Sequence, residues 1–144
     1  MYKIIDTSEV VPGLEEAFRR YNFILRDMES NVPKVPGAVP YIPGYKDCRV
    51  FYDTETYYFC IFDFNEVTEE LEIQEFYAPN NGKEFLKELL KATVKDFAYI
   101  YLDIIDVNVR AKRFWFKQFG KPNNVWKSEY WITGYEFSYW RGKE

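Results

Sequence analysis

The chain has 144 residues, of which 47% are hydrophobic and 21% aromatic, and its net charge at neutral pH is −4. This length and composition predict a single globular domain over residues 1–144. No apolar run reaches the roughly 18 residues needed to cross a bilayer, and the N-terminus lacks the basic and then apolar pattern of a secretory signal. We therefore expect a cytoplasmic protein that does not bind membranes.

The chain contains no histidine and only two cysteines, Cys48 and Cys60. This composition excludes imidazole-based catalytic couples and histidine-containing metal centres, and two cysteines alone make no structural zinc site. We expect no bound metal, and any general base must be a carboxylate, a tyrosinate, an amine or a relayed water. We expect the cysteines to point to opposite faces of a hairpin as reduced, buried thiols.

The charge is unevenly distributed along the chain. Residues 1–76 contain 7 basic and 15 acidic residues, which is a net charge of −8, whereas residues 77–144 contain 12 basic and 8 acidic residues, which is +4. The acidic half argues against nucleic-acid binding, and the basic half suits an anionic cofactor or partner. Two solvated faces of opposite sign would produce the same pattern.

The N-terminal part predicts a short strand over residues 2–5, a helix and a long loop. The helix is expected to begin near Pro12, a residue tolerated in the first turn. Its apolar residues recur at helical spacing, so one face is expected to pack on the core. Residues 30–44 carry four prolines and two glycines, which predict a loop that serves as a substrate lid, as a binding edge or only as a surface connection.

The rest of the chain alternates strands and helices. The predicted elements are strands at 48–53, 56–65 and 71–78, a turn at 79–82, a helix at 83–97, a strand at 99–107, a helix at 109–119 and a hairpin of 125–132 with 135–140. The strand, helix and strand between 71 and 107 form a crossover, which places two parallel strands side by side. We expect the last hairpin to turn at Thr133-Gly134, and its exposed aromatic residues make a homodimer one expectation.

This order of elements resembles the fold of the GCN5-related N-acetyltransferases (GNAT), an α+β fold with a central mixed, twisted sheet of six to seven strands flanked by helices. The most specific local match is similar to the family segment N-x-x-A-x-x-F-Y-x-K-x-G-F, with one residue inserted before the glycine. The matching residues are Asn108, Ala111, Phe114, Lys117 and Gly120. The resemblance implies acetyl-CoA as cofactor and an amine acceptor, either a small molecule or a protein.

In this family the fourth strand splays from the fifth, so its free backbone groups hold the pantetheine arm. The loop and helix N-terminus that follow hold the pyrophosphate. The resemblance implies the residues that contact the cofactor in this chain. They are Phe76, Tyr77 and Ala78 along the arm, Asn81, Gly82 and Lys83 at the phosphates, and Asn108 and Phe114 beside the thiol end.

The resemblance also implies where catalysis takes place. Glu72 occupies a strand position that serves as the base in some relatives, and Glu75 lies further along the same strand, so both are candidate catalytic bases. Where many relatives carry an acidic tyrosine, this chain has Trp115, or Phe116 if the inserted residue is placed earlier in the segment. The three fixed positions of the family's R/Q-x-x-G-x-G/A pattern are here Asn81, Glu84 and Leu86.

Two hypotheses therefore stay open. The first is an acyl-CoA-dependent N-acyltransferase that transfers an acetyl group to an amine of an unknown acceptor. The second is a catalytically inactive protein of the same fold that inhibits or regulates a protein partner through its acidic face or its aromatic surface.

Overall fold

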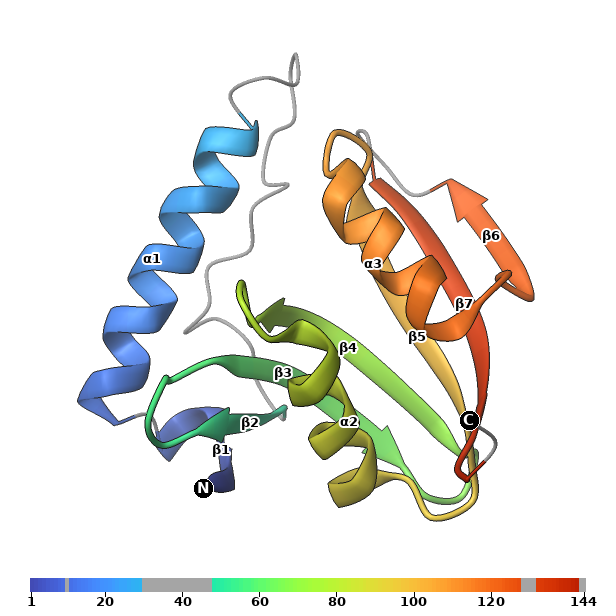
Figure 1. Ribbon diagram of the computed structural model, residues 1–144, viewed down its shortest axis with the longest axis horizontal. Helices are drawn as coiled ribbons and strands as arrows, with labels where there is room; N and C mark the ends of the chain where they lie inside the picture. The colour runs from blue at the N-terminus through green and yellow to red at the C-terminus, as the bar shows by residue number, and fades with distance from the viewer. Residues whose placement is uncertain (10, 30–47, 128–131, 143–144) are drawn as a thin grey trace.

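The computed structural model describes residues 1–9, 11–29, 48–127 and 132–142, with the side chains of 25–29 left out of the description. The predicted loop at 30–44 lies outside these residues. In the described chain the strands form one seven-stranded sheet of order β1-β2-β3-β4-β5-β7-β6 (Figure 1). The strands are β1 (Tyr2–Asp6), β2 (Arg49–Asp53), β3 (Phe59–Asn65), β4 (Glu70–Tyr77), β5 (Phe97–Ile105), β6 (Asn124–Lys127) and β7 (Ile132–Trp140).

The sheet is mixed, as predicted. β4 and β5 are parallel, and the other neighbouring strands in the described sheet are antiparallel. The parallel pair is joined by the crossover helix α2 (Gly82–Thr93), while α1 (Pro12–Glu29) follows β1 and α3 (Val109–Phe119) follows β5. The expected α+β architecture, a mixed sheet flanked by helices, is therefore confirmed.

The helices cover the two faces of the sheet unequally (Figure 1). On one face, Leu14 and Phe18 of α1 pack against Val50, Phe59 and Ile61 of β2 and β3. This face is the α1 face. None of the helices in the described ranges is long and apolar enough to span a membrane.

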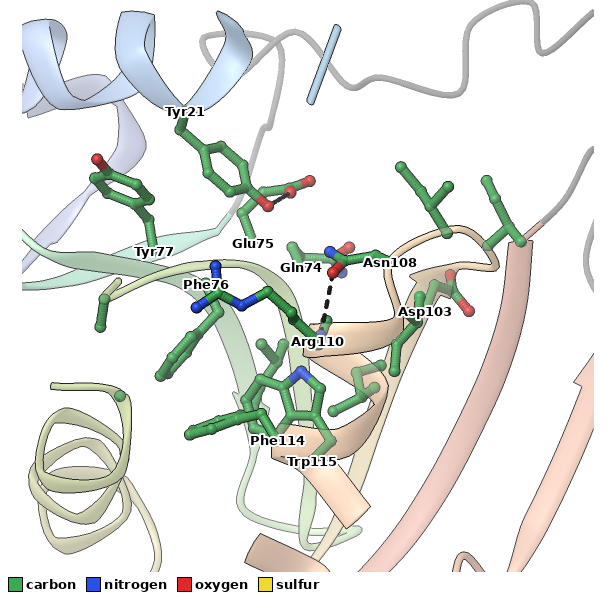
Figure 2. A pocket seen from close by; sticks show the side chains of 18 of the residues that line it. Tyr21, Gln74, Glu75, Phe76, Tyr77, Asp103, Asn108, Arg110, Phe114 and Trp115 are labelled. Carbon is green, nitrogen blue, oxygen red and sulfur yellow. Dashed lines mark hydrogen bonds between the residues drawn. The ribbon is translucent and has the colours of Figure 1, made fainter. Parts of the chain in front are cut away.

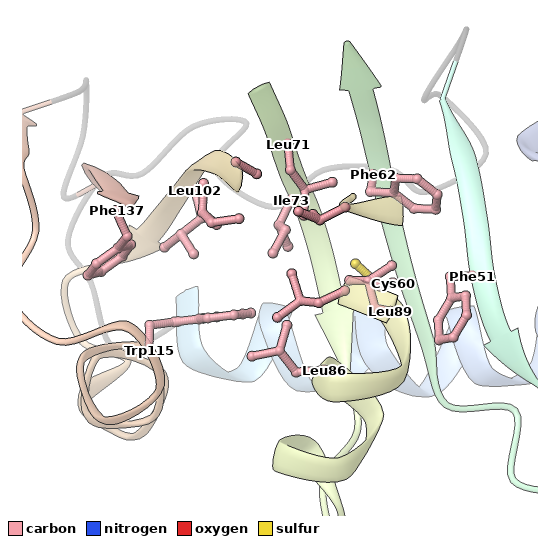
Figure 3. Close-up of a cluster of buried hydrophobic side chains, with 14 of the residues drawn as sticks. Phe51, Cys60, Phe62, Leu71, Ile73, Leu86, Leu89, Leu102, Trp115 and Phe137 are labelled. Atoms are coloured by element: carbon pink, nitrogen blue, oxygen red, sulfur yellow. The ribbon is translucent and has the colours of Figure 1, made fainter. Parts of the chain in front are cut away.

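The opposite face carries the larger core, between the sheet and the helices α2 and α3 (Figure 3). Its strand residues include Phe62, Leu71 and Phe137, which are fully buried. Leu89 of α2 and Trp115 of α3 close the core from below. Much of the aromatic content is used here, because each buried ring removes a large apolar area from water.

The helix limits follow from local chemistry. The start of α1 at Pro12 was predicted and is confirmed. The prediction that the crossover helix continues to residue 97 is wrong, because α2 ends at Thr93 and Val94 takes an extended backbone that buries its side chain. The α3 helix ends at Phe119 and is followed by Gly120, whose φ of +80° is a conformation that glycine adopts without strain.

The predicted turn at Thr133-Gly134 is wrong. Both residues lie inside β7, where they pair with β6, and β6 ends at Lys127. A β-carbon at Gly134 would lie 2.2 Å from the indole ring of Trp126. Glycine is therefore required here because the ring lies close to the strand backbone. A glycine in the sequence can mark such a close approach as well as a turn.

The two cysteines lie on opposite faces of the sheet, as predicted, and neither forms a disulfide. Cys60 is buried as expected, whereas Cys48 is only half-buried. Cys60 belongs to the core beneath α2 and α3, whereas Cys48 packs against the α1 cluster on the opposite face. Burial raises the pKa of the Cys60 thiol well above its ordinary value, which keeps the thiol protonated and unreactive.

One polar cluster ties the last strands to the end of β5. The carboxylate of Asp106 accepts hydrogen bonds from Lys127 Nζ and from Thr133 Oγ1, both at 2.6 Å. Burial alone would raise the pKa of Asp106, but these two donors lower it below the ordinary 3.8. Thr133 is 5% exposed, so its hydroxyl depends on this acceptor.

We predict that Asp106→Ala lowers the free energy of unfolding by about 1–3 kcal/mol at neutral pH, because the buried Thr133 hydroxyl loses its acceptor. Because the pKa of Asp106 is lowered in the folded state, its contribution is present above pH 3.8 and is lost as pH falls below that value. Urea unfolding at pH 7 and pH 3 measures both effects. Lys127→Met, which removes only an exposed partner, should cost less than about 1 kcal/mol; equal losses for the two variants would contradict this account.

Candidate active site at the β4–β5 opening

The parallel strands β4 and β5 separate part of the way along. They pair from Glu70 with Tyr99 to Ile73 with Leu102. Beyond this point β4 continues to Tyr77 and β5 to Ile105 without pairing to each other. The backbone groups of Gln74–Tyr77 that point toward β5 therefore have no partner on that strand, and they face an opening.

A β-bulge lies where the separation begins. On β3, Ile61 pairs with Glu75 while the next residue, Phe62, pairs with Ile73, so Gln74 is an extra residue on β4. Side chains normally alternate between the faces of a strand, which would put Glu72 and Glu75 on opposite faces. The extra residue resets this alternation. As a result both carboxylates lie on the α1 face.

A cavity of about 810 Å³ occupies the opening (Figure 2). Its volume is within the range usual for sites that bind small molecules and cofactors. Residues from both faces of the sheet line it. The α1 mouth includes Tyr21, Glu72, Glu75, Tyr101, Asp103 and Trp126, and the α2–α3 mouth includes Phe76, Ala78, Gly82, Arg110 and Phe114.

Aromatic rings build the wall of the α2–α3 mouth. The ring of Phe76 lies 5.0 Å from that of Trp115 and 5.6 Å from that of Phe114, measured between centroids. Phe85 of α2 packs against the other side of Phe76 at 5.6 Å. Phe76 is thus fixed where β4, α2 and α3 meet, and it forms a rigid apolar surface beside the part of β4 that does not pair with β5.

The same mouth is electrically positive. The N-terminus of α2 begins at Gly82, and the side chain of Asn81 forms no capping hydrogen bond. The first amides of a helix attract anions when no side chain caps them. Figure 2 shows Arg110 extending from α3 toward Phe76, and its guanidinium forms no ion pair with any described residue. A helix N-terminus and an arginine therefore flank one entrance of the cavity.

The α1 mouth is acidic. Glu75 is only 7% exposed, and its Oε1 accepts a hydrogen bond from the hydroxyl of Tyr21 on α1 (Figure 2). The Tyr21 ring is held by Phe59 and Tyr77, with centroids at 5.5 and 5.7 Å. Glu72 is exposed and accepts a hydrogen bond of 3.1 Å from Gln74 Nε2. One carboxylate is thus buried and held, while the other is solvated.

A third carboxylate faces the α1 mouth from β5. Leu102 and Ile104 point into the core, so Asp103 between them points to the α1 face. Asp103 is exposed but lines the cavity, and the partial desolvation of its carboxyl by the surrounding walls raises its pKa above 3.8. Tyr101 lies two residues before Asp103 on β5. A hydrogen bond to Glu136 and, to a smaller extent, burial raise the pKa of its phenol to about 12.

Most residues expected from the sequence lie at the cavity. Those that line it are Glu72, Glu75, Phe76, Tyr77, Ala78, Gly82, Asn108 and Phe114, whereas Asn81 and Lys83 are exposed outside its lining. Asn108 also caps α3, because its side chain accepts a hydrogen bond of 3.1 Å from the Ala111 amide. Their roles in binding and catalysis stay predictions.

Sequence reasoning missed several cavity residues. Tyr21 was assigned only to the core face of its helix, and Arg110, Asp103, Tyr101 and Trp126 received no role. Asp103 had a visible signal, since it is a carboxylate within the most apolar strand of the chain. Arg110 and Trp126 had none, because their proximity to the cavity depends on contacts between distant segments.

Comparison with known proteins identifies the fold. No protein-family model matches the chain, and no curated protein sequence matches it. Among solved structures, Escherichia coli ElaA superposes with a TM-score of 0.59 at 13% sequence identity, covering 95% of this chain and 99% of ElaA. A Desulfovibrio desulfuricans protein assigned to the GNAT family of acetyltransferases superposes with the same score at 11% identity, covering 97% and 99% of the two chains. The chain therefore has the GNAT fold.

Proposed function

We propose that the chain is an acyl-CoA-dependent N-acyltransferase that transfers an acetyl group to an amine. The observation that carries this proposal is the opening between β4 and β5, along which the backbone of Gln74–Tyr77 does not pair with β5. A positive entrance on the α2–α3 face and an acidic entrance on the α1 face suit an anionic cofactor and a cationic amine, respectively.

The residues of the α2–α3 mouth fit acetyl-CoA. The strand backbone from Gln74 to Tyr77 offers donors and acceptors to an amide-bearing arm, beside the apolar wall of Phe76 and Phe114. The start of α2 at Gly82 and the guanidinium of Arg110 would bind phosphates. Glu84 lies in the first turn of α2 but is exposed and outside the lining, so solvent screens its repulsion of phosphates.

When bound, acetyl-CoA supplies an activated acetyl thioester. The chain's own contribution begins with the amides of β4, whose N–H groups would polarise the acyl carbonyl at the start of the opening. We assign the proton-accepting role to Glu75, which lies beside this point and is held by Tyr21. Its carboxylate takes a proton from the acceptor amine, directly or through a water, as the amine displaces the coenzyme A thiolate from the acyl carbon.

Glu72 and Trp115 have different roles in this proposal. Glu72 is solvated on the α1 mouth and would attract a cationic acceptor. Trp115 stands at the position of the family's acidic tyrosine, is 5% exposed, and carries an indole N–H that donates hydrogen bonds but is not an acid. Its presence is the observation that favours the second hypothesis, a non-catalytic protein that binds a partner.

Cofactor binding separates the two hypotheses. We predict that acetyl-CoA at about 100 times its Kd stabilises the protein by roughly 2.7 kcal/mol, which raises the melting temperature by several degrees. Gly82→Asp should weaken this binding more than tenfold, because it adds a negative charge at the helix start and a β-carbon 2.9 Å from the Phe114 ring.

Glu84→Gln should strengthen binding a few-fold in the same assay, since it removes a charge from the first turn of α2. Glu88→Gln removes the same charge one turn further along and serves as the control, with little change expected. The transferase is refuted if acetyl-CoA does not stabilise the parent protein. The assigned phosphate site is refuted if Gly82→Asp strengthens acetyl-CoA binding and Glu84→Gln weakens it.

For the chemical step, we predict that Glu75→Gln lowers kcat at least about 100-fold while acetyl-CoA binding is unchanged. Tyr21→Phe should lower kcat less and displace the pH profile, because Tyr21 positions the carboxylate and does not take the proton. Glu70→Gln, on the same strand but outside the cavity, is the control. A larger loss for Glu72→Gln than for Glu75→Gln would reassign the base.

A further inference from the structure

The α1 mouth contains an arrangement that the transfer reaction itself does not need. Trp126 on β6, Gly134 on β7 and Asp103 on β5 are neighbours in one row across the sheet, because Gly134 pairs with both of the others. Gly134 has no side chain, so the indole ring lies across β7, where a β-carbon would be 2.2 Å away. The ring is thereby brought toward Asp103.

A second ring borders the same place. Tyr101 precedes Asp103 by two residues on β5 and so shares its face, and its ring centroid lies 6.3 Å from that of Trp126. The two rings and the carboxylate of Asp103 all line the cavity. Within the described residues Asp103 forms no ion pair. Aromatic faces together with a carboxylate form a binding site for an ammonium group, which both attract.

This place is separate from the proposed proton acceptor. Glu75 and Asp103 stand on strands that have already diverged, so their positions differ by more than the strand spacing of about 4.8 Å. An acceptor that reaches from one carboxylate to the other needs two polar ends joined by a short chain. Arg110 is the cation in the described lining, and it belongs to the α2–α3 mouth.

We propose that the acceptor is an aliphatic diamine or polyamine, whose second ammonium group is bound by Asp103, Tyr101 and Trp126 while its first amine reacts beside Glu75. This inference rests on the proposed function and names the substrate class of the same site. Asp103 is then a specificity-determining residue. The raised pKa of its carboxyl agrees with a partly desolvated group, whose charged form a bound cation would stabilise.

Three acceptors of equal length isolate the distal charge. 1,4-Diaminobutane ends in a cation, 4-amino-1-butanol in a neutral hydroxyl and 4-aminobutanoate in an anion. We expect kcat/KM, measured by thiol release from acetyl-CoA, to fall in that order, with at least a tenfold preference for the diamine over the alcohol. Equal values, or a preference for the alcohol or the anion, would overturn the proposal.

Variants test the assigned residues. Asp103→Asn should abolish the preference for the diamine over the alcohol, whereas Asp96→Asn, which removes the same charge outside the cavity, should keep it. Trp126→Leu should reduce the preference a few-fold, as expected for a lost cation–π contact. An unchanged preference in Asp103→Asn would refute its role.

Calorimetric titration of the three amines into the protein in the presence of CoA measures binding without turnover. We expect the affinities to fall in the same order, from the diamine to the alcohol to the anion. If acetyl-CoA fails to stabilise the protein, the transferase and its acceptor both fail, and the order of amine binding then decides only whether Asp103, Tyr101 and Trp126 bind an ammonium group. If acetyl-CoA binds and the amines bind equally, the acceptor inference alone fails.

Discussion

The site depends on the separation of β4 from β5. Each of these strands is held on its other side, because β5 pairs with β7 over nine residue pairs and β4 pairs with β3 as far as Tyr77. Neither strand can move to close the gap without breaking these ladders. The bulge at Gln74 bends β4 where pairing with β5 stops, and the rings of Phe76 and Trp115 fill the space beneath the opening.

Two properties follow from this separation. The first is a cavity lined by residues of both sheet faces, which gives two molecules separate approaches to the same region. The second is a segregation of charge, with Arg110 and the start of α2 at one entrance and three carboxylates at the other. An enzyme that joins an anionic cofactor to a cationic amine needs both properties, since each reactant is attracted to its own side.

The fold was predictable because its signals are local. Apolar spacing and Pro12 located α1, and the glycine turn between two apolar strands located the crossover that makes β4 and β5 parallel. The errors were local as well. Thr133-Gly134 has the composition of a turn, but Gly134 is required in the strand by the ring of Trp126.

The site was predictable only in part, because its chemistry depends on contacts that the sequence does not encode locally. Simple alternation along a strand would place Glu72 and Glu75 on opposite faces, and only the extra residue at Gln74, visible in the pairing with β3, brings them to the same face. The contact of Tyr21 with Glu75 joins residues 54 positions apart. Asp103 gains its neighbours from β6 and β7, and no pattern within β5 predicts them.

The central claim is that the edge of β4 that does not pair with β5 binds the cofactor arm. The most direct measurement is an amide ¹H–¹⁵N NMR titration with CoA, which reports each backbone N–H separately. Binding at the opening predicts that the largest shifts fall on Gln74–Tyr77 and on the first turn of α2 from Gly82, with β1 and β2 unaffected. The absence of shifts at Gln74–Tyr77, or shifts concentrated elsewhere on the sheet, would contradict the account.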